Sequence, residues 1–256
     1  MFMKTIFITG AGAGIGLATA RRFAREGWRV GAADRDPQAL AALARELGSS
    51  CWPLRMDVTD VDSVRRALAE FGMRSNGRLD VLMNNAGVLK VGAFEQISMA
   101  EHARIMQINV IGLMQVLHAA FPLLRDTDGA QVINMSSASA IYGIPDFASY
   151  SASKHAVRAL TEALDLEWET HGIRVTDLMP PFVNTGMVQA NLGASRLFDT
   201  LGVDLAAADI AEAAWQLVRK PRVHRPVSWR MRLLWPVSQV APAALTRGLM
   251  RVLRRA

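Results

Sequence analysis

The chain has 256 residues, of which 51% are hydrophobic and 20% are charged. This composition excludes an intrinsically disordered polymer, and the length suffices for one α/β domain with a sizeable buried core. The formal net charge is +6, and the single cysteine, Cys51, excludes an intrachain disulfide and suits a reducing compartment such as the cytoplasm.

The hydrophobic pattern alternates between strands and helices along most of the chain. Strands are expected at 4–9, 29–33, 51–56, 79–84, 131–135 and 174–179, and helices at 15–26, 37–47, 61–71, 105–124 and 149–170. A further strand is expected within 223–229. Such alternation predicts a single doubly wound, Rossmann-like α/β domain over residues 1–222, with a parallel sheet of about seven strands covered by helices on both faces.

Two segments depart from the regular alternation of strands and helices. Residues 105–124 carry no charge and are long enough to span a bilayer. They include Gln107, Asn109 and Pro122, so a buried or interface helix is predicted instead. Residues 186–206 have a weak pattern and are predicted to form a mobile loop. No secretory signal is expected, because the first nine residues lead directly into a strand.

A glycine-rich turn joins the first strand to the first helix, with the sequence Thr-Gly-Ala-Gly-Ala-Gly-Ile-Gly over residues 9–16. Glycines let the backbone approach a pyrophosphate, and a helix N-terminus supplies N–H donors and a positive dipole. For this motif alone, a tight turn without a ligand is the alternative. The cofactor-binding residues predicted here are Gly10, Gly14, Ile15 and Gly16.

Asp34 ends the second strand, 24 residues after Gly10. A carboxylate at this position accepts hydrogen bonds from the adenosine ribose hydroxyls and repels a 2′-phosphate. NAD(H) is therefore predicted as the preferred cofactor, with NADP(H) as the alternative. The neighbouring Arg35 would stack on the adenine or meet a phosphate.

Small and polar residues follow the next two strands. Asp57 and Val58 come after the third strand, where an adenine would bind, and Asn-Asn-Ala-Gly over residues 84–87 ends the fourth. Open α/β sheets bind ligands at the carboxyl ends of their strands. Asn85, Ala86 and Gly87 are therefore predicted to contact the cofactor.

Tyr150 and Lys154 lie four residues apart in a helical pattern and so share one helix face. A nearby ammonium lowers the pKa of a tyrosine by favouring the phenolate, which produces a general acid/base. Taken alone, the pair would be a surface pair. Ser137 follows the fifth strand at the same edge of the sheet, where its hydroxyl would hold a carbonyl or alkoxide oxygen.

These patterns together resemble the short-chain dehydrogenase/reductase family: T-G-x-x-x-G-x-G at 9–16, N-N-A-G at 84–87 and Y-x-A-S-K at 150–154. The resemblance covers residues 3–220. It implies that Tyr150 exchanges a proton with the substrate oxygen, that Ser137 holds this oxygen, and that Lys154 binds the nicotinamide ribose. It also implies that Asn109 positions a water molecule in a proton relay with Lys154.

The resemblance places the nicotinamide carboxamide after the sixth strand, against Pro180, Val183 and Thr185. Here Pro181 replaces the family's glycine, which fixes φ and removes an N–H donor. Ala140 replaces a common glycine after the serine and is expected to narrow the pocket by about a methyl group. The predicted substrate pocket is Ser139, Ile141, Tyr142, Ile144, Phe147, Pro181, Phe182, Met187 and Leu192.

None of these pocket residues is charged, which favours a hydrophobic secondary alcohol and its ketone or aldehyde as substrates. The predicted enzyme is thus an NAD(P)-dependent oxidoreductase acting on CH–OH groups. A catalytically silent NAD(H)-binding sensor or scaffold on the same fold is the alternative. The five histidines have no metal-ligand spacing, and no metal is expected.

Residues 223–256 are predicted to form a basic C-terminal extension. From residue 213 onward the chain has ten basic residues and no acidic one. On a helix over 243–255, Leu245, Leu249, Val252 and Leu253 would share one side. Such a helix is typical of peripheral contact with the inner face of a membrane, but packing against the body or a second subunit is an equal alternative. A homo-dimer or homo-tetramer is expected, and no nucleic-acid partner.

Overall fold

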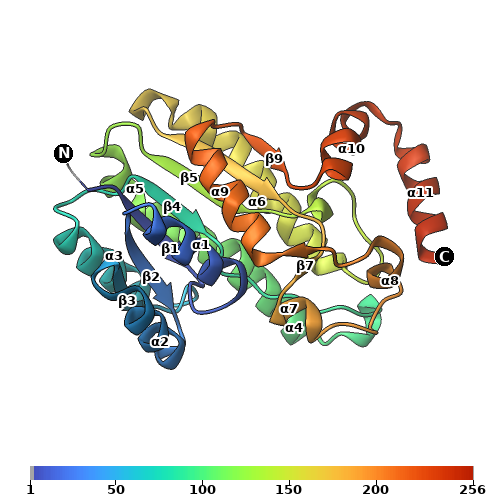
Figure 1. Cartoon of the computed structure of the whole chain (residues 1–256). Coiled ribbons are helices and arrows are strands. Elements are labelled where there is room, and N and C mark those ends of the chain that lie inside the picture. Colours follow the sequence, from blue (N-terminus) through green and yellow to red (C-terminus); the bar gives the residue numbers. More distant parts are fainter. Residues whose placement is uncertain (1–2, 256) are drawn as a thin grey trace.

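The computed structural model describes residues 3–255 and contains a seven-stranded parallel sheet (Figure 1). The strand order is β3-β2-β1-β4-β5-β6-β9. The strands are β1 (Thr5–Thr9), β2 (Arg29–Asp34), β3 (Cys51–Arg55), β4 (Val81–Asn84), β5 (Gln131–Met135), β6 (Arg174–Met179) and β9 (His224–Pro226). The order reverses between β1 and β4, as in a doubly wound sheet.

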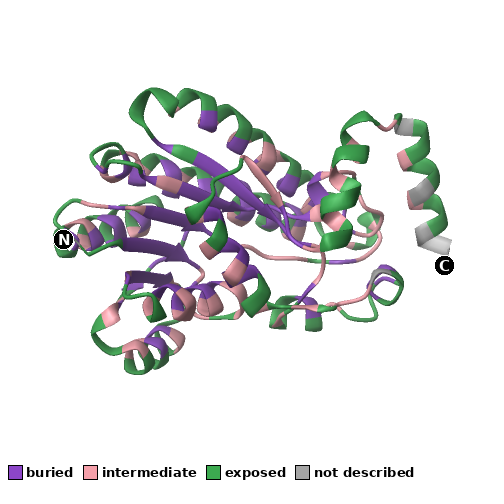
Figure 2. Ribbon diagram, turned by 45° about the horizontal axis from the view of Figure 1, so that its top comes forward, coloured by how far each residue is buried: buried purple, intermediate pink, exposed green. Residues whose placement is uncertain are grey.

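Helices cover both faces of this sheet. One face is covered by α1 (Gly14–Arg25), α2 (Pro37–Leu47) and α9 (Ala207–Arg219), and the other by α3 (Val61–Arg74), α5 (Leu113–Arg125) and α6 (Ala148–Glu167). Neighbouring residues of β1 point to opposite faces, so Ile6 and Ile8 lie in the first core and Phe7 in the second. Figure 2 shows the strands as the buried centre of the molecule. The doubly wound α/β fold is thereby confirmed.

The long uncharged helix predicted at 105–124 begins earlier and is not a uniform α-helix. It comprises α4 (Met99–Met106), a π-helical turn (Gln107–Gly112) and α5. By length and composition alone, Met99–Arg125 would be able to cross a membrane. However, its inner face lies in the core beside α3 and α6, where Val116, Ala120 and Leu124 are fully buried. This is the packing of a core helix.

The segment 186–206, expected to be a mobile loop, instead forms short elements. These are α7 (Gly186–Gln189), α8 (Leu197–Leu201) and β8 (Leu205–Ala206), which pairs in parallel with β7 (Val183–Asn184). Leu197 and Phe198 are buried together with Phe147. Because the elements have only two to five residues, no hydrophobic period develops in the sequence.

The C-terminal segment adds one strand and two helices. β9 pairs with β6 at the edge of the sheet, within the predicted range 223–229. It is followed by α10 (Trp229–Val240) and α11 (Ala243–Arg255), which stand away from the sheet in Figure 1. β9 belongs to the main sheet, although it lies within the range 223–256 predicted as an extension. The boundary at residue 222 stays a prediction.

Candidate active site

A cleft of about 490 Å³ opens at the carboxyl ends of β1, β2, β4, β5 and β6. The predicted cofactor-binding residues and the predicted catalytic and substrate-pocket residues meet in this cleft, although they lie up to 177 residues apart in the sequence. The predicted residues that line it are Gly10, Gly14, Ile15, Asp34, Arg35, Asp57, Val58, Asn85, Ala86, Gly87, Ser137, Phe147, Tyr150, Lys154, Pro180, Pro181, Phe182, Val183, Thr185 and Met187.

The glycine turn forms one end of this cleft. Gly10 and Gly14 have φ values of +67° and +51°, a conformation that favours glycine. Helix α1 starts after Ala13, and no side chain caps it. The first backbone N–H groups of the helix therefore have no hydrogen bond to a capping side chain and remain available at the cleft. A pyrophosphate fits this arrangement, because it would accept these hydrogen bonds.

Gly16 was predicted to bind the cofactor, but it does not line the cleft. A Cβ atom on Gly16 would lie 2.1 Å from the carbonyl oxygen of Gly10 and 2.7 Å from Asn85 Nδ2. Its missing side chain therefore permits the tight packing of helix α1 against the turn. The amide of Asn85 has a related role, donating to the carbonyls of Thr9 at 3.0 Å and Gly10 at 3.1 Å. Both residues shape the turn.

Asp34 lies at the far end of the cleft, with its carboxylate fixed by backbone donors. Gly12 N donates to Oδ2 at 2.8 Å and Asp36 N donates to Oδ1 at 3.0 Å. Asp57 lies nearby, and its pKa is lowered, first by a hydrogen bond from the Thr59 backbone and also by the charge of Arg35. This end of the cleft thus presents two carboxylates and one guanidinium, groups that can hydrogen-bond a nucleoside.

Helix α6 presents Tyr150 and Lys154 to the cleft from the same face. The Lys154 ammonium donates to the carbonyl of Met135 at 2.7 Å and lies 5.5 Å from the centre of the Tyr150 ring. Burial lowers the pKa of Lys154 to about 8. Burial also raises the pKa of Tyr150 to about 12, and a hydrogen bond with the Ser137 side chain only partly opposes this.

The lowering of the tyrosine pKa by Lys154, expected from the sequence, is therefore absent in this structure. The reason is that desolvation penalises both charged forms, and the lysine directs its ammonium at a carbonyl rather than at the phenol. At neutral pH Tyr150 carries its proton. In this state it is a proton donor.

Ser137 begins a short 3₁₀ turn (Ala138–Ala140) after β5. Its Oγ accepts a hydrogen bond from Ser139 N at 3.1 Å and reaches Tyr150. The turn is tied to the end of β6 by the hydrogen bond from Ala138 N to the carbonyl of Pro180, at 2.9 Å. The serine and tyrosine hydroxyls therefore lie side by side and offer two donors to one substrate oxygen.

Asn109 lies behind the cleft wall rather than in it. It sits in the π-helical turn and is fully buried, with Nδ2 donating to the carbonyl of Val88 at 3.0 Å and to Ser153 Oγ at 3.1 Å. Val88 N donates in return to Asn109 Oδ1 at 2.8 Å. The side chain thus holds the cleft-lining Val88 in place. π-turns of this kind are frequent at functional sites.

Five residues predicted for the substrate pocket lie outside the cleft. Ser139 is buried in the 3₁₀ turn, while Leu192 is 45% exposed on the surface, and Ile144 packs in the apolar cluster around Phe147. The other two are Ile141 and Tyr142, which follow the 3₁₀ turn. Ala140, expected to narrow the pocket, is fully buried outside the cleft lining.

Other residues line the cleft without having been predicted. Three of these residues could have been found from the sequence because they adjoin a motif: Ser136 precedes Ser137, and Val88 and Leu89 follow Asn-Asn-Ala-Gly. The full set is Ala13, Met56, Val88, Leu89, Ile108, Met135, Ser136, Gly186 and Val188. Among residues 3–255, no group of three or more histidine, cysteine, aspartate or glutamate side chains is placed to hold a metal ion.

Comparison with known proteins identifies the family. The family described as short chain dehydrogenase matches residues 4–195, which include the turn, Asp34 and the Tyr150–Lys154 pair. The chain belongs to the short-chain dehydrogenase family. Its members include a serine 3-dehydrogenase from Agrobacterium fabrum, which is 34% identical over 225 residues (85% of this chain, 89% of the relative). A sorbitol dehydrogenase from Cereibacter sphaeroides is 36% identical over 182 residues, or 71% of each chain.

Solved structures of short-chain dehydrogenases have the same fold. One from Burkholderia phymatum, in complex with NAD, superimposes with a TM-score of 0.82 and 26% identity, covering 93% of this chain and 92% of that chain. A 3-ketoacyl-(acyl-carrier-protein) reductase from Brucella melitensis, complexed with NADH, has a TM-score of 0.80 and 29% identity, covering 88% and 96%. This short-chain dehydrogenase is accordingly an oxidoreductase that acts on CH–OH groups with a nicotinamide cofactor.

Proposed function

We propose that the protein interconverts a hydrophobic secondary alcohol and its ketone, or an aldehyde, with NAD(H) as the preferred cofactor. The observation that carries this proposal is the cleft itself, in which Ser137, Tyr150 and Lys154 meet between a nucleotide-binding end and an apolar end. The bound dinucleotide supplies the hydride donor or acceptor. The side chains of the cleft handle the proton and the substrate oxygen.

In the reducing direction, Tyr150 donates its proton to the substrate oxygen as the carbonyl carbon receives the hydride. Ser137 donates a hydrogen bond to the same oxygen and stabilises the developing negative charge. In the oxidising direction, the phenolate accepts the hydroxyl proton while the hydride leaves the carbinol carbon. By the family resemblance, Lys154 would bind the nicotinamide ribose and stabilise that phenolate. In the structure, its ammonium donates to the Met135 carbonyl.

Asn109 holds parts of the cleft wall in position through hydrogen bonds. Its carboxamide holds Val88 in the cleft wall and Ser153 on helix α6, one position before Lys154.

The cofactor would lie along the cleft. The pyrophosphate would face Gly10, Gly14 and Ile15, and the nicotinamide would face Thr185 and the wall from Pro180 to Val183. Pro181 offers that wall no N–H donor.

The preference for NAD(H) over NADP(H) rests on Asp34. Its carboxylate is held in the cleft by two backbone N–H groups, so it cannot swing away from a 2′-phosphate without losing both. Arg35 is the one guanidinium among the described cleft residues and would offset part of this repulsion. Two fixed hydrogen bonds favour the carboxylate's role as acceptor for ribose hydroxyls.

The class of substrate follows from where the charges lie. The charged residues lining the cleft are Asp34, Arg35, Asp57 and Lys154, all at the nucleotide end or at the reacting centre. The opposite end is formed by Leu89, Phe147, Phe182, Met187 and Val188. A free amino acid such as serine would leave its charges unpaired against these side chains, which is costly. An uncharged, lipophilic alcohol matches them.

A turnover screen tests the proposal. Purified protein is incubated with NAD or NADP and a panel of lipophilic secondary alcohols, and with the reduced cofactors and the matching ketones, while absorbance of the reduced nicotinamide is followed. We expect turnover with NAD(H) and at least one lipophilic pair, and none with serine or sorbitol. Tight NADH binding without any turnover would instead support the silent nucleotide-binding sensor.

We further propose that the enzyme is a cytoplasmic homo-oligomer. Met106, Ile111 and Met114 are 37%, 40% and 44% exposed along the outer side of the long helix, beside a groove formed with α3. A second copy covering this apolar strip would remove it from water. Sedimentation velocity tests this, because an Ile111→Glu, Met114→Glu variant is expected to lower the oligomeric state.

A further inference from the structure

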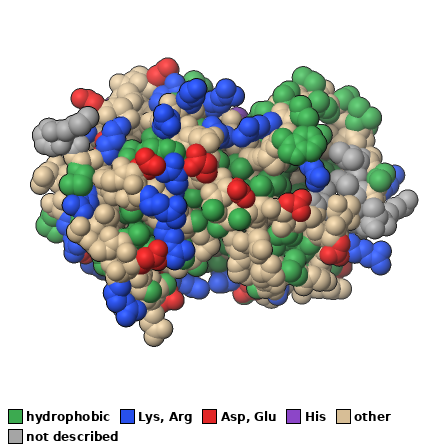
Figure 3. All heavy atoms as spheres, viewed as in Figure 1, with side chains coloured by type: hydrophobic (Ala, Val, Ile, Leu, Met, Phe, Trp, Pro, Cys, Tyr) green, Lys and Arg blue, Asp and Glu red, His purple; other side chains and the backbone are tan. Residues whose placement is uncertain are grey.

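The outer side of helix α10 is apolar and faces solvent. Trp229, Leu233, Val237 and Val240 are 68%, 65%, 59% and 81% exposed. They are spaced by four, four and three residues, so they form one stripe along the helix. Figure 3 shows hydrophobic side chains gathered over this end of the molecule, at the upper right of the view. An exposed apolar patch of this kind marks an interaction site.

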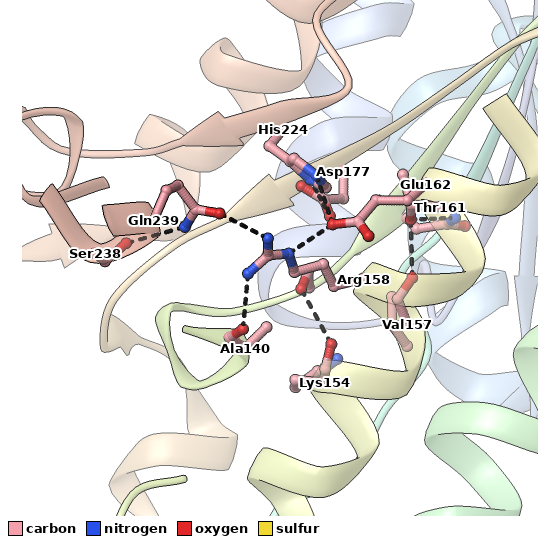
Figure 4. A network of polar contacts seen from close by, with 12 residues as sticks. Ala140, Lys154, Val157, Arg158, Thr161, Glu162, Asp177, His224, Ser238 and Gln239 are labelled. Carbon is pink, nitrogen blue, oxygen red and sulfur yellow. Dashed lines mark hydrogen bonds and ion pairs between the residues drawn. The ribbon is translucent and has the colours of Figure 1, made fainter. Parts of the chain in front are cut away.

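The opposite side of α10 contacts the body, so the stripe faces away from it. The ring of Trp235 stacks 4.8 Å from the Arg158 guanidinium and lies 5.2 Å from the His224 ring. Arg158 Nη2 also donates to Gln239 Oε1 at 2.9 Å. Figure 4 shows Arg158 reaching from α6 to Gln239.

The anchor itself extends into the sheet. His224 lies between the fully buried Asp177 on β6 and Glu162 on α6, with each carboxylate 3.0 Å from one ring nitrogen (Figure 4). Glu162 in turn pairs with Arg158 at 2.8 Å. This network determines which side of α10 faces outward.

Helix α11 also has exposed apolar residues. Leu245 and Val252, two turns apart, are 67% and 64% exposed, and Arg247 and Arg251 lie on another side of the helix and are also exposed. Leu249 and Leu253, expected from the sequence on the side of Leu245, lie outside the residues whose side chains are described. Apolar side chains flanked by arginines on a short helix are typical of segments that lie in the membrane interface.

The charge of this region favours an anionic partner. From residue 213 onward there are ten basic residues and no acidic one. A symmetric contact between two copies through α10 would bring Arg230 and Arg232 of each copy together, and Asp204, 3.8 Å from Arg230, offsets part of this charge. A membrane rich in anionic phospholipid provides the missing negative charge, and Trp229 is a residue type enriched at the headgroup level.

We propose that α10 and α11 form a docking surface for an anionic phospholipid bilayer. α11 contacts α8, whose Leu197 and Phe198 pack against Phe147 and Phe182 at the apolar end of the cleft. Docking therefore brings the apolar end of the cleft toward the lipid, where a lipophilic alcohol dissolves. This last consequence rests on the proposed function, whereas docking itself does not.

The test is co-sedimentation of the full chain with vesicles, which needs no enzymatic activity. The vesicles are phosphatidylcholine alone, or phosphatidylcholine with roughly a third phosphatidylserine. We expect binding to the anionic vesicles that weakens with salt, and little binding to the neutral ones. The variant Leu233→Glu, Val237→Glu should bind at least tenfold more weakly. Leu166→Glu, a matched change at a 73% exposed leucine on α6, should bind like the natural chain.

A second variant keeps the test informative if the first is poorly folded. Arg247→Ala, Arg251→Ala leaves the α10 stripe intact and removes two charges, each expected to reduce binding by about fivefold. No sedimentation of the natural chain with anionic vesicles at low salt would overturn the proposal, and so would equal binding by all variants. A concentration-dependent dimer that Leu233→Glu, Val237→Glu abolishes, without vesicle binding, would assign the surface to a second copy.

Discussion

Replacing Gly16 by alanine should damage the nucleotide end of the cleft, although Gly16 does not line it. The new Cβ would lie 2.1 Å from the carbonyl oxygen of Gly10, whereas real Cβ contacts are essentially never below 3.0 Å. The glycine turn or helix α1 must therefore shift by nearly 1 Å. The Asn85 side chain is also in the way, because its Nδ2 lies 2.7 Å from the new atom.

Overpacking of this kind costs about 1–3 kcal/mol. For a chain of this size, that lowers the melting temperature by roughly 2–4 °C per kcal/mol. The displaced turn should also weaken NADH binding by at least about tenfold, since backbone N–H groups at the helix start lose their alignment. Thermal unfolding and a fluorescence titration with NADH measure the two effects separately.

Gly143→Ala is the matched control, because a Cβ at that position meets nothing within 4 Å and its φ lies outside the left-handed region. We expect it to behave like the natural chain in both assays. If Gly16→Ala matched Gly143→Ala in melting temperature and in NADH affinity, the packing account of the turn would be refuted.

Two further predictions concern the cofactor end and the anchor of α10. Asp34→Ala removes the fixed carboxylate and should raise the ratio of NADPH affinity to NADH affinity at least about tenfold. The control Asp36→Ala removes the cap of α2 and should cost about 1 kcal/mol of stability while leaving this ratio unchanged. Competitive titrations with the two cofactors measure the ratio. Burial lowers the pKa of His224, but its hydrogen bond to Asp177 and the charge of Asp177 outweigh this, and the net pKa is raised. Its stabilising contribution is therefore complete below the unfolded value of about 6.5 and is lost as pH rises through the folded value. In the natural chain the denaturant midpoint should fall between acidic and alkaline pH, and His224→Gln should make this fall smaller. His118→Gln is the control at an exposed site. An equally steep fall in both variants would contradict the stabilising role of His224.

Much of the fold follows from sequence periodicity because the long elements repeat their pattern several times. The strands of the sheet are apolar along their length, and Tyr150 and Lys154 must share a face of any helix that contains both. The glycine turn and Asp34 are fixed to the ends of neighbouring strands by the parallel order. These features needed no knowledge of side-chain packing.

Features that depend on packing between distant segments were not predictable. The contacts of Phe198 with Phe147 and Phe182 make the 186–206 segment ordered, yet no period in that segment signals them. The raised pKa of Tyr150 depends on its burial. The alignment of Asp177 with His224 depends on the register of β6 with β9.

The central claim, that Tyr150 is the proton donor and acceptor, is tested most directly by removing its hydroxyl. The chain has two tyrosines, and Tyr142, which lies outside the cleft lining, is the natural control. We predict that Tyr150→Phe lowers turnover at least about a thousandfold while NADH affinity stays within a few-fold, and that Tyr142→Phe retains full activity. Retained turnover in Tyr150→Phe would contradict the account.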